Sequence, residues 1–134
     1  MTSYEEKLIR LKSKWFSNEH QIASIIKTRL YIDNNLHKNL NLDLLSEMRF
    51  TSKFHLHRLF KRYYGLTPKQ YLTDRRIKKS KEYLINGMSV TETCYAVGFE
   101  SLGSFSKLFK DKIGKSPSVF QKEQESRSLI ATDS

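Results

Sequence analysis

The chain repeats itself: the stretch that begins near Phe50 recurs, in chemistry and in order, 49 residues further along. The matching positions share a capping hydroxyl, an aromatic ring, a positive charge, a glycine or a proline. These pairs are Phe50 and Phe99, Ser52 and Ser101, Arg58 and Lys107, Phe60 and Phe109, Lys61 and Lys110, Gly65 and Gly114, Thr67 and Ser116, Pro68 and Pro117, and Tyr71 and Phe120. Agreement at so many chemically different positions predicts two copies of one supersecondary unit.

Each copy has the pattern of a short helix, a corner of about three residues and a longer helix, which is the helix-turn-helix layout. Apolar residues recur with the period of an α-helix and strand-like alternation is hard to find, so the chain is predicted to be all-α. In the longer helix of the first copy, the residues expected to face the core are Leu56, Leu59, Phe60 and Tyr63.

Caps and helix breakers predict the organisation along the chain. We expect an N-terminal helical extension over residues 1–20, a double helix-turn-helix domain over 21–124 and a frayed tail over 125–134. Within the domain we expect a first unit over 42–64, a linker helix over 67–86 and a second unit over 90–113. The N-terminal helix is expected to begin at Ser3, with Glu6 completing a capping box, and a second helix to carry Ile22. The first corner is expected near Arg49.

The charge of the chain favours a polyanionic partner. Lys and Arg number 24 against 14 acidic residues, which gives a formal net charge of +10. This excess favours nucleic acid over a membrane surface or an acidic protein. The single cysteine, Cys94, rules out a disulfide framework within the chain and is expected to be a packed thiol. There is no signal-peptide pattern and no apolar run long enough to span a membrane, so we expect a cytoplasmic, nucleoid-associated protein.

The outer face of each longer helix carries the candidate DNA contacts. In the first copy Phe54, His57, Arg58 and Lys61 lie at helical spacing, and in the second Gly103, Ser106, Lys107 and Lys110 form the same line, with Leu102 at its tip. Arginine can pair bidentately with guanine and phenylalanine can contact a thymine methyl, so the first line is expected to read bases. The side chains of the second line are smaller, so this line is expected to contribute more to phosphate contact and positioning than to base reading.

A second set of residues is expected to contact phosphate groups. These residues are Ser52, Lys53, His55, Lys61, Arg62, Ser101, Ser104 and Lys110. The expected linker helix of about 18 residues spans roughly 27 Å at 1.5 Å per residue. That length is close to one turn of B-DNA, about 34 Å, so the two recognition helices are expected to enter successive major grooves.

Two groups of motifs resemble the AraC/XylS family of bacterial transcription regulators. The first group is SKFHLHRLFK at 52–61, GLTP at 65–68 and YLTDRRI at 71–77, and the second is GFESLGSFSKLFK at 98–110 and GKSPSVF at 114–120. The similarity extends from about Ile22 to Gln124. It implies a seven-helix, homeodomain-like domain with two helix-turn-helix units joined by a long linker helix, usually in a transcriptional activator that touches RNA polymerase.

The resemblance also implies roles for individual residues. The positions that match base-contacting sites of the family are Phe54, His57, Arg58, Leu102, Gly103, Ser106 and Lys107. The chain departs from the family pattern at Arg49, where a small residue is common, and at Leu45 and Cys94, which replace a usual alanine. Lys107 replaces a usual arginine and Gly103 offers no side chain, so both weaken the expected readout by the second unit. The chain has no room for a separate sensor domain, so it resembles the single-domain members or a fragment.

The remaining features leave the partners partly open. The histidines and carboxylates show no pattern of a metal site or a catalytic pair, so we expect no metal, no cofactor and no enzyme activity. The N-terminal helix carries an apolar stripe of Tyr4, Leu8, Leu11 and Trp15. This stripe either packs on the chain's own domain or forms a dimer contact, with a membrane surface as a weaker alternative. Double-stranded DNA is thus the expected partner, bound by a monomer or a weak dimer.

Overall fold

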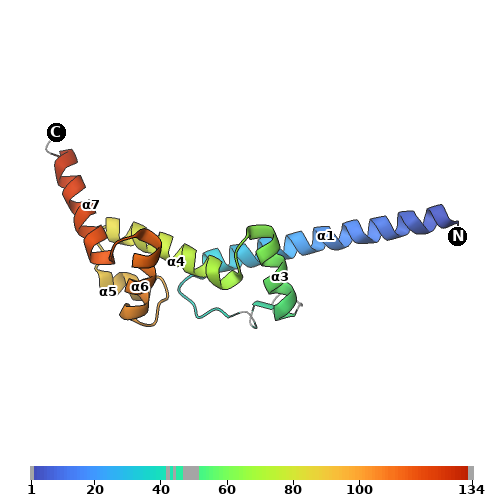
Figure 1. Cartoon of the computed structure of the whole chain (residues 1–134), viewed down its shortest axis with the longest axis horizontal. Helices are drawn as coiled ribbons and strands as arrows, with labels where there is room; N and C mark the ends of the chain where they lie inside the picture. Colours follow the sequence, from blue (N-terminus) through green and yellow to red (C-terminus); the bar gives the residue numbers. More distant parts are fainter. Residues whose placement is uncertain (1, 42, 44, 47–51, 133–134) are drawn as a thin grey trace. The chain divides into compact units, whose positions relative to one another are not determined.

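The fold is helical, as the sequence predicts (Figure 1). The computed structural model describes residues 2–41, 43, 45, 46 and 52–132, and this part of the chain contains no β-strand. The helices whose two ends lie in this part of the chain are α1 (Ser3–Asn34), α3 (Lys53–Tyr64), α4 (Pro68–Ile85), α5 (Val90–Ala96), α6 (Leu102–Ile113) and α7 (Pro117–Thr132). Of the short helix expected before the first corner, residues 43, 45 and 46 are helical. Its other residues and the corner near Arg49 lie outside the described residues.

The chain divides into two compact units. Unit 1 comprises Met1–Asn34 and Leu40–Lys69, and it carries α1 and α3. Unit 2 comprises Asn35–Asn39 and Gln70–Ser134, and it carries most of α4 together with α5, α6 and α7. Each unit therefore holds the recognition helix of one copy of the repeat.

The sequence repeat is also a repeat of local structure. Helices α3 and α6 have 12 residues each, and their bounds differ by the 49 residues of the sequence shift. Each helix begins after a serine whose hydroxyl accepts a backbone N–H, Ser52 from His55 and Ser101 from Ser104. Each ends at a glycine with positive φ, 74° at Gly65 and 93° at Gly114. The same start and stop signals thus define the same helix twice.

Helix α1 differs from the sequence prediction, because it is one continuous helix of 32 residues rather than two. It contains neither glycine nor proline, so nothing in its sequence forces a break near residue 20. Its capping box also lies one residue earlier than predicted. The Oγ1 of Thr2 accepts the Glu5 N–H at 3.2 Å, and the Thr2 N–H donates to the Glu5 carboxylate at 3.4 Å.

The core of unit 1 forms where α1 packs against α3. Its buried apolar side chains are Ile25, Ile32, Leu45, Leu56 and Phe60. The predicted core stripe of α3 is narrower than expected, because Leu59 is only partly buried and Tyr63 is 41% exposed. The Arg29 guanidinium lies 5.9 Å from the ring centre of Tyr64, which adds a cation–π contact between the two helices.

The core of unit 2 is built around phenylalanines. The rings of Phe99 and Phe105, Phe105 and Phe109, and Phe109 and Phe120 have their centres 5.2, 5.8 and 5.5 Å apart. Ile77, Leu84 and Cys94 complete this cluster. Cys94 is fully buried, which confirms the prediction of a packed thiol, and burial raises the pKa of its thiol. The cluster joins α4, α5, α6 and α7 and so fixes the orientation of α6 within its unit.

The C-terminal helix is longer than predicted. Helix α7 continues to Thr132, where the sequence predicts a frayed tail. The side chains of residues 125–130 are exposed, so this extension contributes little to the core. The anchored part of α7 includes Gln121, whose side-chain amide donates to the carbonyls of Leu84 at 3.0 Å and Met88 at 2.7 Å. Gln121 thereby satisfies two carbonyls at and just beyond the end of α4.

Candidate nucleic-acid interface

The outer face of α3 gathers basic and aromatic side chains. Leu56 and Phe60 occupy the buried side of the helix, which leaves the line through Phe54, His57 and Arg58 exposed. Phe54 is 71% exposed, which is unusual for a phenylalanine in a packed domain. Lys61, at the end of the same line, is also exposed. The four side chains that are predicted to line the DNA-facing side of α3 are therefore all exposed on one face of the helix. Their contacts with bases stay a prediction.

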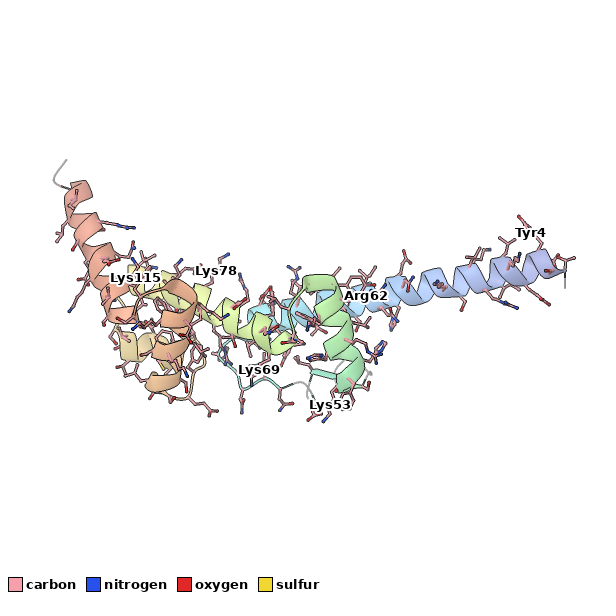
Figure 2. The ribbon with its side chains drawn as sticks, viewed as in Figure 1. Tyr4, Lys53, Arg62, Lys69, Lys78 and Lys115 are labelled. Atoms are coloured by element: carbon pink, nitrogen blue, oxygen red, sulfur yellow. The ribbon has the colours of Figure 1, made fainter. Side chains whose placement is uncertain are left out.

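Positive charge dominates α3. The helix contains four basic residues and no acidic residue, and the bases are Lys53, Arg58, Lys61 and Arg62. All four are exposed, and Lys53 and Arg62 project from the helix in Figure 2. Lys53 lies 3.6 Å from the Asp43 carboxylate and 5.4 Å from the ring centre of Phe54. This pair is solvent-exposed, so a phosphate could replace the carboxylate at little cost.

The predicted phosphate contacts include the two capping serines. Ser52 and Ser101 are exposed, and each uses its oxygen to accept a backbone N–H of its helix. A hydroxyl also has a proton to donate, so capping leaves each serine able to bond a phosphate oxygen. Ser104 is exposed as well, whereas His55 is partly buried. These four residues thus lie in the first turns of the two recognition helices, where anions are favoured.

The outer face of α6 is smaller and less charged. Gly103, Lys107 and Lys110 are exposed, Leu102 is 39% exposed, and Ser106 is partly buried. The helix also contains Asp111 and Lys112. Lys112 forms an ion pair within the fold, because its ammonium lies 2.5 Å from the Asp74 carboxylate of α4. The difference between α3 and α6 that the sequence suggests is therefore present in the exposed surface.

Gly103 leaves an open space on α6. A Cβ atom added at this residue meets no other atom within 4 Å, and the residue has ordinary helical backbone angles. We expect Gly103→Ala to raise the free energy of unfolding by about 0.5–1 kcal/mol, because alanine loses less backbone entropy in a helix. Urea denaturation followed by circular dichroism measures this change. A stability equal to or below that of the parent chain would contradict the open environment.

The turn before α6 is held by a contact that the sequence does not reveal. Gly98 has a φ of 100°, and an added Cβ would lie 2.5 Å from the carbonyl oxygen of Leu36. The Arg76 side chain donates from Nε to that same carbonyl and from Nη2 to the carbonyl of Lys38, both at 2.8 Å. Arg76 also lies 5.7 Å from the ring centre of Phe99. One guanidinium therefore joins α4, the loop after α1 and the turn that leads into α6.

The Arg76 guanidinium donates to backbone carbonyls that lie about 40 residues away along the chain. Half-burial lowers the pKa of the guanidinium, and Glu100 opposes that effect. Backbone carbonyls are available at every residue, so no pattern of side chains could have pointed to these partners. The only signal in the sequence was a glycine followed by an aromatic residue at the corner.

Two other classes of site find no support in the described residues. Nowhere in them do three or more His, Cys, Asp or Glu side chains gather in a way that could hold a metal ion. Among the same residues, no helix is both long and apolar enough to cross a membrane.

Two copies of one capped helix, each with an exposed outer face and a buried inner face, define a helix-turn-helix domain. A family model described as "Helix-turn-helix domain" matches residues 45–123. The transcriptional activator AarP of Providencia stuartii is 31% identical over 110 residues, which cover 79% of this chain and 82% of AarP. The chain belongs to the AraC/XylS family of transcription regulators, as its motifs predict.

Two further comparisons define the extent of the likeness. The bifunctional transcriptional activator and DNA repair enzyme AdaA of Bacillus subtilis is 34% identical over 92 residues, covering 68% of this chain and 44% of AdaA. The chain thus spans less than half the length of AdaA. The DNA-binding domain of the global transcriptional factor AdpA, solved in complex with a target DNA, matches this chain with a TM-score of 0.74. It is 22% identical, and the match covers 77% of this chain and 94% of that domain, so it shows the shared fold.

Proposed function

We propose that the chain is a sequence-specific DNA-binding transcription regulator, and specifically an activator. In this proposal α3 and α6 enter successive major grooves. The observation that carries it is the repeated recognition helix, whose buried side is fixed by the core and whose outer side is exposed and basic. AarP and AdaA are both named transcriptional activators, and AdpA was solved with DNA, which supports carrying the same role to this chain.

The two helices are assigned unequal roles. Phe54, His57 and Arg58 read base edges, because they combine a ring, an imidazole and a bidentate donor on one exposed line. On α6, Leu102, Gly103, Ser106 and Lys107 approach the bases with less hydrogen-bonding capacity. Phosphate contacts by the exposed lysines and the capping serines set the position of the domain on DNA. Helix α4 has 18 residues, about 27 Å, and serves as the connection between the two recognition helices.

The proposal extends to partners and location. The regulator contacts RNA polymerase when bound upstream of a promoter, and it works in the bacterial cytoplasm. The residues of this chain act in DNA binding rather than in catalysis; AdaA is named as a repair enzyme as well as an activator, and the match covers 44% of AdaA.

Arg58→Ala tests the reading role of α3. We expect it to weaken binding to the preferred sequence by about 1–3 kcal/mol and to relax the preference at one base pair. Selection from a random duplex pool, with the parent chain and then with the variant, measures both effects. Arg127→Ala is the matched control, because Arg127 is an exposed arginine on α7, which is not one of the two recognition helices.

The rival hypothesis is an adaptor that uses its helical surfaces to bind another protein and binds DNA only through its charge. Under that hypothesis no sequence is enriched from the pool, the salt dependence is the same on every duplex, and Arg58→Ala has the same effect as Arg127→Ala. Any one of these three results would reject sequence-specific recognition by α3.

A further inference from the structure

A tight turn that follows α1 is fixed through its backbone. The Lys38 N–H donates to the Asn35 carbonyl at 3.0 Å, which closes a turn over residues 35–38. Arg76 donates from Nε to the Leu36 carbonyl and from Nη2 to the Lys38 carbonyl, both at 2.8 Å. The carbonyls of Asn35, Leu36 and Lys38 are therefore all hydrogen-bonded, so the backbone of the turn is held in one conformation.

This turn lies beside the turn that leads into α6. Residues Asn35–Asn39 belong to unit 2, although the residues before and after them in the chain belong to unit 1. A Cβ added at Gly98 would lie 2.5 Å from the Leu36 carbonyl oxygen and 2.9 Å from the Arg76 Nη2 atom. Gly98 is followed three residues later by Ser101, the N-cap of α6. The fixed turn is thus a neighbour of the segment that opens the second recognition helix.

The exposed side chains of the turn take no part in holding it. Leu36 is partly buried, whereas His37 and Lys38 are exposed. Arg76 binds only backbone carbonyls of the turn, so the fold requires no basic side chain at positions 37 and 38. A basic side chain on a backbone that is already ordered loses less entropy when it binds a ligand. The turn is therefore organised to present His37 and Lys38 to a partner.

The charge around the turn favours an anion. Burial lowers the pKa of the Arg76 guanidinium, and the charge of Glu100 opposes that effect, so Glu100 acts on Arg76. Lys38 adds a positive charge next to these two residues, and a ring nitrogen of His37 can donate a hydrogen bond. A duplex bound by α6 would bring backbone phosphates close to the start of that helix. Phosphate groups of DNA are therefore the anions that the turn would meet.

We propose that Lys38 and His37 form a phosphate-binding turn, which contacts the DNA backbone next to the groove that α6 enters. Arg76 is a positioning residue in this arrangement, because it holds the turn by two carbonyls and does not itself touch DNA. The contact carries no sequence information, so it strengthens binding to every duplex and adds to the few contacts that the small side chains of α6 can make. This inference rests on the proposed function, since it takes α6 as a groove-binding helix.

The first experiment removes the charge of Lys38. Lys38→Gln leaves in place the carbonyl that Arg76 binds, so the turn keeps its anchor. The logarithm of the binding constant falls linearly with the logarithm of the salt concentration, and we expect this slope to decrease in magnitude by about 0.9, the value for one phosphate contact. Affinity should fall severalfold, by the same factor on the preferred sequence and on an unrelated duplex. Fluorescence anisotropy titrations over a series of potassium chloride concentrations measure both effects, and urea denaturation checks the fold.

Lys12→Gln is the matched control for Lys38→Gln. It removes the same charge from an exposed lysine of α1, which is not a recognition helix, so the salt slope should stay as it is in the parent chain. Equal slopes for Lys38→Gln and Lys12→Gln would overturn the proposal. A loss of affinity that appears only on the preferred sequence would also overturn it, because a phosphate contact is independent of sequence.

The second experiment tests the positioning role of Arg76. Arg76→Lys keeps the charge but replaces the planar fork, which donates to two carbonyls, with a single nitrogen. The turn is then held less firmly, so Lys38→Gln should change the salt slope less in this background than in the parent chain. An undiminished effect of Lys38→Gln would reject the positioning role. If Arg76→Lys does not fold, Lys38→Gln alone decides whether the turn binds phosphate.

Failure of this inference and failure of the proposed function give different results. If no sequence is enriched from the random pool but Lys38→Gln lowers the slope, sequence-specific recognition is rejected and the phosphate contact is supported. If a sequence is enriched and the slope does not change, the reverse holds. A chain that binds no duplex at any salt concentration would reject both.

Discussion

Gly98→Ala is expected to destabilise unit 2 by about 3 kcal/mol or more, a large fraction of the stability of a small domain. Two causes act together. The φ of 100° is a backbone conformation that alanine rarely adopts, and the new Cβ would lie 2.5 Å from the Leu36 carbonyl oxygen. That oxygen cannot move away freely, because it accepts the hydrogen bond from Arg76. Urea denaturation and hydrogen exchange of the amides in α5 and α6 measure the loss.

Gly87→Ala separates the two causes. Gly87 has nearly the same backbone angle, with a φ of 94°, but a Cβ added there meets no atom within 4 Å. Gly87→Ala should therefore show only the conformational cost, about 1 kcal/mol. Equal losses for Gly87→Ala and Gly98→Ala would contradict the steric role of the Leu36 carbonyl and, with it, the tie between the loop after α1 and the turn before α6.

Local signals in the sequence were sufficient to predict the two recognition helices. The capping serines, the terminal glycines and the prolines that open α4 and α7 act over a few residues, so the 49-residue shift located α3 and α6 to the residue. The same logic placed the exposed line of Phe54 opposite the buried side of α3. Such helix boundaries can be predicted from the sequence because the interactions that define them join residues close together in the chain.

Structural features that depend on distant parts of the chain were not predicted from the sequence. The continuity of α1 through residue 20 is permitted rather than required by its sequence, since good helix formers do not distinguish one helix from two. The contacts of Arg76 join residues about 40 positions apart through backbone carbonyls, which carry no sequence signature. The extent of α7 was underestimated because a polar, exposed segment resembles a frayed end by composition.

Phe109→Ala is expected to cost about 3–5 kcal/mol, because it removes a fully buried ring and leaves a cavity. Phe109 lies between Phe105 and Phe120 in the core of unit 2, so its loss removes two ring contacts at once. We expect the amides of α5, α6 and the first turns of α7 to exchange faster, and DNA binding through α6 to be lost with them. Chemical denaturation gives the free energy, and hydrogen exchange shows where protection falls.

Phe54→Ala is the informative control, since it is the same substitution on the exposed side of a recognition helix. Phe54 is 71% exposed, so its removal should change the free energy of unfolding by no more than about 0.5 kcal/mol. If α3 reads bases as proposed, Phe54→Ala nevertheless weakens binding to the preferred sequence. A stable variant with reduced binding therefore places Phe54 in the interface, and an unstable one would show instead that its ring packs in the fold. The pair of phenylalanines thus separates what holds a recognition helix from what the helix presents to DNA.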